Sequence, residues 1–382
     1  MIYDADTHYC PRYLFDNLKD KHPNFVEFYN ETCKGEDLDK VWRESYNQIK
    51  DPSWPECNVR SDFNKLPDWI RAELKTHLSG SRIKINDDLT KLYVEDFRNQ
   101  FPTLEDHLYY LDILKTDYQL LAMYAPFKLM YYQTEKNLAL DITRTWNDKI
   151  YDLATNNDKF GAVAWLPLQD LQSSIKELEH VINKNFFTAQ LNDNPYWSFM
   201  PDLWIIFEIF EKNRFPVYLH PTKYNPYPLP WTWIQNKNYE LFRNRWNTPD
   251  EFWLTNIAGM ISEGMLDKYP NLRIILAEHG VDWISEMRDI MISNGLPDPL
   301  PYFKNNFWFT IEPEKPNFLR DAELIGWDRL LFATDYPHND LGGLNKFNDV
   351  DAINLLLSQN KITKKDYDLL THENFLWLKN NR

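Results

Sequence analysis

The chain has 382 residues, of which 43% are hydrophobic and 16% aromatic, and its formal net charge is -15. This negative charge argues against a nucleic-acid partner, whose phosphates the protein would repel. The hydrophobic content supports a large core, and one α/β barrel with an insertion is the simplest organisation at this length. We therefore expect a single barrel domain over residues 1–382.

The cysteines and the apolar stretches indicate where the protein resides. Cys10, Cys33 and Cys57 include no pair with the spacing of metal ligands, so neither a disulfide framework nor a structural zinc site is expected. The most apolar stretch, residues 203–210, is interrupted by Glu208 and is too short to cross a bilayer. No basic and then apolar segment opens the sequence. We expect a cytoplasmic protein without a membrane partner.

Apolar patterns along the chain alternate between the period of a strand and that of a helix. Residues 1–6 predict a first strand, whereas residues 31–101 are polar and rich in turn signals, as in an insertion or lid. The later strands are predicted at residues 118–124, 160–168, 186–191, 216–220, 272–277, 307–311 and 330–333. The helices are predicted at residues 134–154, 171–183, 199–212, 248–268, 283–293, 316–324 and 350–378. Ser173 and Ser174, ahead of Glu177, predict a cap for the second of these helices.

Strands that alternate with helices predict parallel strands joined by right-handed crossovers. Both a closed barrel and an open doubly wound sheet satisfy this pattern. The dinucleotide- and nucleotide-binding versions of the open sheet carry a glycine-rich turn after the first strand, and this chain has none. We therefore predict an α/β fold, a (β/α)8 TIM barrel with an inserted lid-like segment after the first strand.

Side chains of the metal-ligand type follow several predicted strands at the point where each strand ends. Asp6 and His8 are two residues apart at the end of the first strand, so both side chains point the same way. His220 ends the fifth strand, and Asp335 follows the eighth. The carboxyl ends of barrel strands meet at one rim, so we expect these four residues to hold one divalent metal ion, zinc or manganese.

Further residues of this type stand after the neighbouring strands. Glu278 and His279 follow the sixth strand, and Gly280 permits a tight turn that exposes the imidazole at the rim. Glu312 follows the seventh strand and is a weaker candidate. Taken singly, each such residue has an ordinary alternative role, since a histidine can be a hydrogen-bonded core residue and an aspartate a helix N-cap.

Four stretches share their order along the chain with a known family. They are residues 4–8 (DADTH), 164–170 (AWLPLQD), 264–283 (GMLDKYPNLRIILAEHGVDW) and 332–338 (FATDYPH). Together they resemble the amidohydrolase-related family, the branch of the amidohydrolase superfamily that contains the aminocarboxymuconate-semialdehyde and resorcylate-type decarboxylases. The resemblance covers most of the chain apart from residues 31–101.

The resemblance implies a role for each ligand-type residue. Asp6 and His8 stand at the family's first-strand metal pair, and His220 is the fifth-strand ligand. His279 is the catalytic histidine, and Asp335 is the catalytic eighth-strand aspartate, which holds the metal or relays protons. Asp6 replaces the histidine of the commoner motif, which shifts the expected ion toward manganese. The fourth strand has no lysine that could be carbamylated to bridge two ions, so one ion is expected.

The activity implied by the resemblance is that of a metal-dependent carboxy-lyase. The metal would stabilise developing charge and His279 would transfer a proton during non-oxidative decarboxylation of a small aromatic or conjugated acid. Two alternatives stay open: a metal-dependent hydrolase of an amide or lactone, and a catalytically inactive binding protein. The family also implies a homodimer.

A cation is expected to bind the carboxylate of the small-molecule substrate. The candidates are Arg288, on the helix after the catalytic histidine, and Arg243, Arg245 and Arg12. The loop at residues 224–233 is rich in proline and aromatic residues, among them Trp231, and is predicted to line the pocket.

Overall fold

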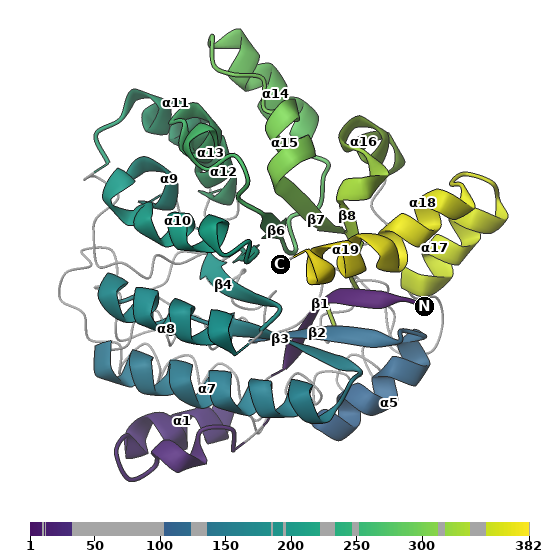
Figure 1. Ribbon diagram of the computed structural model, residues 1–382. Helices are drawn as coiled ribbons and strands as arrows, with labels where there is room; N and C mark the ends of the chain where they lie inside the picture. Colours follow the sequence, from purple (N-terminus) through teal and green to yellow (C-terminus); the bar gives the residue numbers. More distant parts are fainter. Residues whose placement is uncertain are drawn as a thin grey trace, which may run out of the picture.

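The computed structural model describes residues 1–9, 11, 13–32, 103–123, 136–184, 186–193, 196–221, 234–246, 252–311, 318–336 and 349–381. Within these ranges, parallel strands form one sheet in the order of the sequence, with helices around them (Figure 1). The strands are β1 (Tyr3–Tyr9), β2 (Tyr118–Met123), β3 (Phe160–Trp165), β4 (Thr188–Asn192), β5 (Val217–His220), β6 (Ile274–Leu276), β7 (Phe307–Ile311) and β8 (Leu330–Phe332). The predicted (β/α)8 barrel fold is confirmed.

The two edges of the sheet meet between β1 and the segment after β8. Thr7 and Tyr336 form a parallel bridge, and the backbone N–H of His8 donates to the carbonyl oxygen of Tyr336 at 2.7 Å. The buried carboxylate of Asp4 accepts hydrogen bonds from the N–H and the hydroxyl of Thr334, at 3.0 and 2.6 Å. Burial raises the pKa of Asp4 to about 8. Backbone pairing and one side chain thus close the barrel.

Helices surround the strands and cover their outer faces (Figure 1). Their bounds are α1 (Pro23–Thr32), α5 (Leu104–Leu114), α7 (Lys136–Asn156), α8 (Leu171–Asn183), α9 (Tyr196–Phe199), α10 (Ile205–Lys212), α11 (Lys237–Arg245), α12 (Phe252–Ser262), α13 (Met265–Lys268), α14 (Ile284–Ser293), α15 (Leu300–Asn306), α16 (Phe318–Ile325), α17 (Asp349–Ser358), α18 (Lys364–Asp368) and α19 (Asn374–Asn380). None of the helices in the described ranges has the length and hydropathy needed to cross a bilayer.

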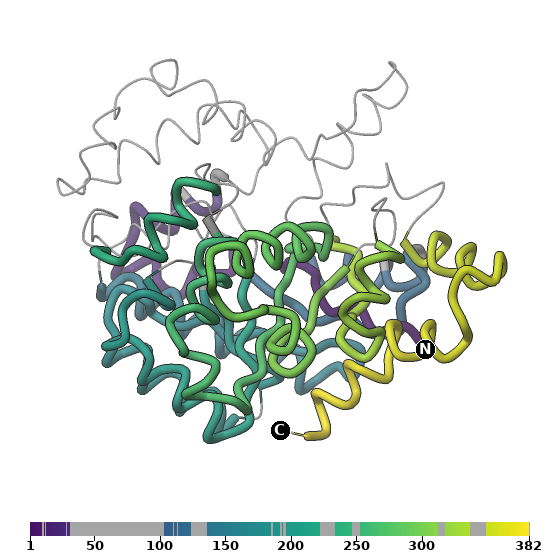
Figure 2. Tube along the Cα trace, turned by 90° about the horizontal axis from the view of Figure 1, so that it is seen from above, coloured from purple at the N-terminus to yellow at the C-terminus, as the bar shows by residue number. Residues whose placement is uncertain are grey.

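The end of the barrel where the strands begin is closed by α19, which runs along the lower edge of the molecule in Figure 2. The ring of Phe375 stacks on Phe187 with centroids 4.5 Å apart and meets Tyr118 edge-on at 5.3 Å. Both partners stand at or next to the first residue of a strand. The interior beyond them is filled by buried side chains that include Leu120, Val163, Ile275 and Leu331. A functional site is therefore expected at the opposite rim, where the strands end.

Two of the predicted helices are divided or shortened in the structure. The helix predicted at 248–268 is split into α12 and α13 at Gly264, whose φ of 76° is left-handed. Of the helix predicted at 199–212, the structure has α10 from Ile205 onward, after a short 3-10 turn at Pro201–Leu203, while α9 ends at Phe199. The helices predicted within 350–378 are α17, α18 and α19. Apolar periodicity continues across such breaks and does not reveal them.

The predicted serine cap of α8 is wrong. The N-cap is Asp170, whose carboxylate accepts a hydrogen bond from the backbone N–H of Ser173 at 2.9 Å. Asp170 also pairs with the ammonium group of Lys136 at 2.6 Å. The predicted lid at residues 31–101 lies outside the described residues beyond the end of α1, so the lid and the single-domain organisation stay predictions.

Candidate metal centre

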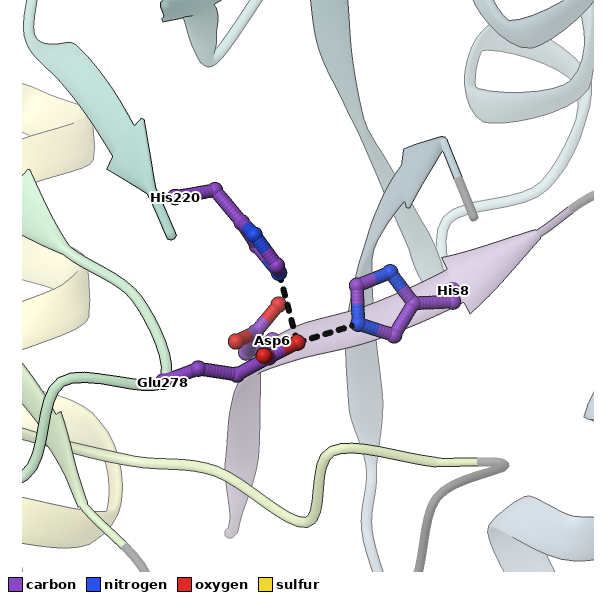
Figure 3. Close-up of side chains that lie close together, drawn as sticks. All are labelled: Asp6, His8, His220 and Glu278. Atoms are coloured by element: carbon purple, nitrogen blue, oxygen red, sulfur yellow. Dashed lines mark hydrogen bonds and ion pairs between the residues drawn. The ribbon is translucent and has the colours of Figure 1, made fainter. Parts of the chain in front are cut away.

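Four side chains converge at the rim where the strands end: Asp6 and His8 of β1, His220 of β5, and Glu278 after β6 (Figure 3). One ligand atom from each lies within 4.8 Å of the other three. The two histidines and Asp6 are buried, and the Glu278 side chain is 20% exposed. Two imidazoles and two carboxylates this close together are a donor set that fits zinc or manganese.

Glu278 lies between the two imidazoles, as Figure 3 shows. Its Oε1 atom is 2.5 Å from Nε2 of His220 and 2.8 Å from Nε2 of His8. Asp335 is close by, with Oδ1 3.0 Å from the same His8 nitrogen. Burial opposes ionisation of Glu278, but the two histidines hold its pKa well below the usual range. Both Nε2 atoms point toward the same position. When unprotonated, each would offer its lone pair to a cation at that position.

The shape of the first strand brings the predicted ligands Asp6 and His8 to this position. The pairing of β1 with β2 shifts register between Asp4 and Thr7, an irregularity of the β-bulge type that redirects side chains. Tyr218, two residues before His220, donates from its hydroxyl to the Asp6 carboxylate. Burial and the charge of Asp6 raise the pKa of Tyr218 well above its usual value, so the phenol remains a donor at neutral pH. This contact orients Asp6.

Two carboxylates of the site extend from strained backbone. Glu278 and Asp335 have φ values of 58° and 52°, a left-handed conformation that non-glycine residues rarely adopt. The N–H of Glu278 donates to the hydroxyl of Thr310 at 3.0 Å, which holds this turn in place. Such strain persists only where the surrounding structure fixes it, and it is concentrated at functional sites.

His279 contacts a second group of buried residues. Its Nε2 atom is 2.6 Å from Oδ2 of Asp193, and both side chains are 0% exposed. The amide of Asn256 donates to the other oxygen of Asp193. The ring of Trp253 lies edge-on to the imidazole with centroids 4.5 Å apart. The predicted catalytic histidine is therefore part of a carboxylate–histidine pair beside the cluster.

The structure brings the predicted ligands Asp6, His8 and His220 together and places Asp335 against His8. The arginines predicted to bind the substrate, where the structure describes them, contact other parts of the protein. Three of them contact other groups: Arg288 pairs with Asp298 at 2.8 Å, Arg245 pairs with Glu286, and Arg243 lies 6.0 Å from the ring of Tyr239. None of these contacts, within the described ranges, involves the metal cluster. Arg12, Trp231 and Glu312 lie outside the described residues, so the substrate-binding assignments stay predictions.

Three residues of the site were not predicted from the sequence. Glu278 is of the ligand type but is not among the four predicted ligands, because its approach depends on a left-handed turn that no sequence pattern reveals. Tyr218 has a sequence signal, since it shares the inward face of its strand with His220 two residues later. Asp193 directly follows β4, the position where barrel enzymes place functional side chains.

Comparison with known proteins identifies relatives of the chain. The sequence model of the amidohydrolase family matches residues 117–374. The γ-resorcylate decarboxylase of Rhizobium sp. (strain MTP-10005) is 29% identical over 231 residues, which are 54% of this chain and 69% of the relative. The γ-resorcylate decarboxylase of Rhodococcus jostii (strain RHA1) is 25% identical over 246 residues, or 57% and 73% of the two chains. The predicted relation to the resorcylate-type decarboxylases is confirmed.

Solved structures share the barrel. A 2,6-dihydroxybenzoate decarboxylase complexed with 2,6-dihydroxybenzoate has a TM-score of 0.60 at 24% identity, over 80% of this chain and 95% of that chain. A 5-carboxyvanillate decarboxylase from Sphingomonas paucimobilis has a TM-score of 0.63 at 17% identity, over 99% and 98%. A dihydroxybenzoic acid decarboxylase from Polaromonas sp. JS666, with bound manganese and the inhibitor 2-nitroresorcinol, has a TM-score of 0.59 at 20% identity, over 100% and 97%. The named relatives are thus decarboxylases, and one of their solved structures contains bound manganese.

Proposed function

Because the chain belongs to the amidohydrolase family, we propose that it is a metal-dependent carboxy-lyase that removes carbon dioxide from a small aromatic or conjugated acid. The observation that carries this proposal is the convergence of Asp6, His8, His220 and Glu278 within 4.8 Å at the strand ends. The γ-resorcylate decarboxylases among the relatives support the reaction type, and the manganese-bound structural relative supports the cofactor.

The ion would be held by Nε2 of His8 and His220 and by the carboxylates of Asp6 and Glu278, with Asp335 as a further oxygen ligand. When bound, it would act as a Lewis acid that stabilises charge developing on the substrate. Up to three carboxylates around one divalent ion leave an excess negative charge, and an oxygen-rich set favours manganese over zinc. An anionic substrate at such a site needs a further cation, which supports the prediction of a substrate-binding arginine.

The residues beside the cluster are the proposed proton-transfer groups. In non-oxidative decarboxylation the electron pair of the broken carbon–carbon bond stays on the substrate carbon, which then takes a proton. His279, the residue after Glu278, is the proposed donor. Asp335, 3.0 Å from His8, is placed to hold the metal or to relay that proton.

Hydrolysis of an amide or lactone is the alternative activity. It has less support than decarboxylation, because the relatives are γ-resorcylate decarboxylases. The other alternative is a catalytically inactive binding protein. The convergence of the ligand-type residues argues against it. A homodimer and a cytoplasmic location stay predictions.

The test is a decarboxylation assay on protein loaded with Mn²⁺, with 2,6-dihydroxybenzoate and 5-carboxyvanillate as first substrates. The expected result is release of one carbon dioxide per substrate consumed, with no oxidant required and no activity after the metal is chelated. His220→Ala serves as the metal-deficient control. Loaded protein that hydrolyses amides or lactones but releases no carbon dioxide from a panel of aromatic acids would contradict the proposal.

A further inference from the structure

The Asp193–His279 pair is linked to the metal cluster at both of its ends. Asp193 follows β4, and its backbone N–H donates to the carbonyl oxygen of His220 at 3.2 Å. His279 directly follows Glu278. Since β5 lies between β4 and β6 in the sheet, the hydrogen bond from His279 to Asp193 crosses the end of the strand that carries His220. The pair therefore lies at the same rim as the cluster.

The partners of Asp193 determine which nitrogen of His279 carries a proton. A carboxylate with a fully buried side chain requires donors at its oxygens. Asn256 donates to one oxygen, and the atom 2.6 Å from the other is Nε2 of His279. Nε2 must therefore carry a hydrogen, and in a neutral imidazole Nδ1 is then a free acceptor. This Nδ1 atom is buried and has no hydrogen-bond partner within the described part of the chain.

Aromatic packing and a backbone contact hold the ring in this orientation. Trp253 lies edge-on to the imidazole at 4.5 Å and edge-on to Trp283 at 5.1 Å. Trp283 in turn donates from its indole nitrogen to the carbonyl oxygen of His279 at 2.9 Å. Both the backbone and the ring of His279 are thus constrained, so the direction of its Nδ1 atom is fixed as well.

We infer that Asp193 is the positioning residue of His279. It holds the tautomer protonated at Nε2 and leaves Nδ1 as the ring atom that takes up a proton from water and then delivers it to the substrate carbon. The second part of this inference rests on the proposed function, whereas the first part stands on the contacts of the pair alone.

The tautomer can be read directly from the protein labelled with ¹⁵N-histidine. His279→Gln assigns the His279 signals among the nine histidines of the chain. We expect an unprotonated Nδ1 and a protonated Nε2 in the wild type, and loss of this preference in Asp193→Asn. A wild-type His279 protonated at Nδ1, or an unchanged tautomer in Asp193→Asn, would overturn the inference. The wild-type spectrum decides the tautomer even if Asp193→Asn does not fold.

A kinetic comparison separates positioning from a structural role. With the Mn²⁺-loaded enzyme and an accepted aromatic acid, Asp193→Asn should lower kcat about 100-fold. KM should change by no more than about twofold and the metal content should not change, because the ligands are intact. Asp193→Glu, which keeps a carboxylate, should restore part of the loss. A wild-type kcat in Asp193→Asn would refute the positioning role.

The matched control is Asp141→Asn, since Asp141 of α7 accepts from Nε2 of His22, the residue before α1, at 2.8 Å in a comparable pair outside the barrel. This variant should alter neither the His279 signals nor turnover. If the wild-type enzyme decarboxylates no acid, the proposed function fails, and the ¹⁵N spectra still decide the tautomer.

Discussion

One oxygen of Glu278 contacts both imidazoles of the cluster, at 2.5 and 2.8 Å. If this carboxylate is a metal ligand, Glu278→Gln removes a charged donor and should weaken Mn²⁺ binding by at least about tenfold. Calorimetric titration with Mn²⁺ measures this change. Glu286→Gln, which breaks the exposed pair with Arg245, is the control and should bind the metal normally. Equal affinity in the wild type and Glu278→Gln would remove this residue from the ligand set.

The hydroxyl of Tyr218 orients Asp6 from within the barrel. Tyr218→Phe should lower Mn²⁺ affinity about 10-fold or more, because partners of metal ligands typically contribute that much. The matched control is Tyr302→Phe, which removes the hydrogen bond of a surface tyrosine to Asp267, 2.8 Å long. Electron paramagnetic resonance of free Mn²⁺ during titration compares the two variants. If both bind alike, Tyr218 does not act through Asp6.

The sequence predicted those site residues whose position follows from strand geometry. Asp6 and His8 are two apart on one strand, and His220 ends another, so their convergence at one rim is a property of the barrel. Glu278 and Asp193 needed three-dimensional information. The direction of Glu278 depends on a left-handed residue, and the role of Asp193 depends on contact with a histidine 86 residues away.

At the scale of secondary structure, the contribution of the α8 N-cap to stability can be tested by mutation. Asp170→Ala should destabilise the protein by about 1 kcal/mol at neutral pH, the usual value of an N-cap. Hydrogen bonds from Lys136 and Ser173 lower the pKa of Asp170 from 3.8 to about 2 in the folded state. Its stabilisation is therefore complete above pH 3.8 and is lost as the pH falls toward 2.

Urea unfolding of the wild type and Asp170→Ala at pH 7 and pH 3 checks this prediction. The difference in the free energy of unfolding between the two proteins should be smaller at pH 3. A difference that is the same at both pH values would mean that the charge of Asp170 does not contribute to the cap.

Element type was more predictable than element ends. The strands of a parallel barrel are buried on both faces and appear as short apolar runs, which the sequence shows clearly. The division of the helices is less visible, because it depends on single residues such as Gly264 and Pro201 within a continuing apolar pattern.

At the scale of the whole molecule, one end of the barrel stabilises the fold and the other end carries the proposed metal site. Phe375 of α19 is 1% exposed and packs where the strands begin, whereas the proposed ligands lie where the strands end. Phe375→Ala should destabilise the fold by about 3 to 5 kcal/mol by leaving a cavity. Mn²⁺ affinity of the folded variant should be unchanged. Chemical denaturation and metal titration measure the two effects, and a large loss of affinity in folded protein would contradict this separation.

The central claim is that ligands distant in sequence hold one divalent ion at the rim of the barrel. Anomalous diffraction at the manganese edge, from crystals of the protein loaded with Mn²⁺, tests it most directly. We predict a single strong peak per chain, bounded by Asp6, His8, His220 and Glu278. A loaded crystal with no peak among these residues, or with its peak elsewhere, would contradict the account.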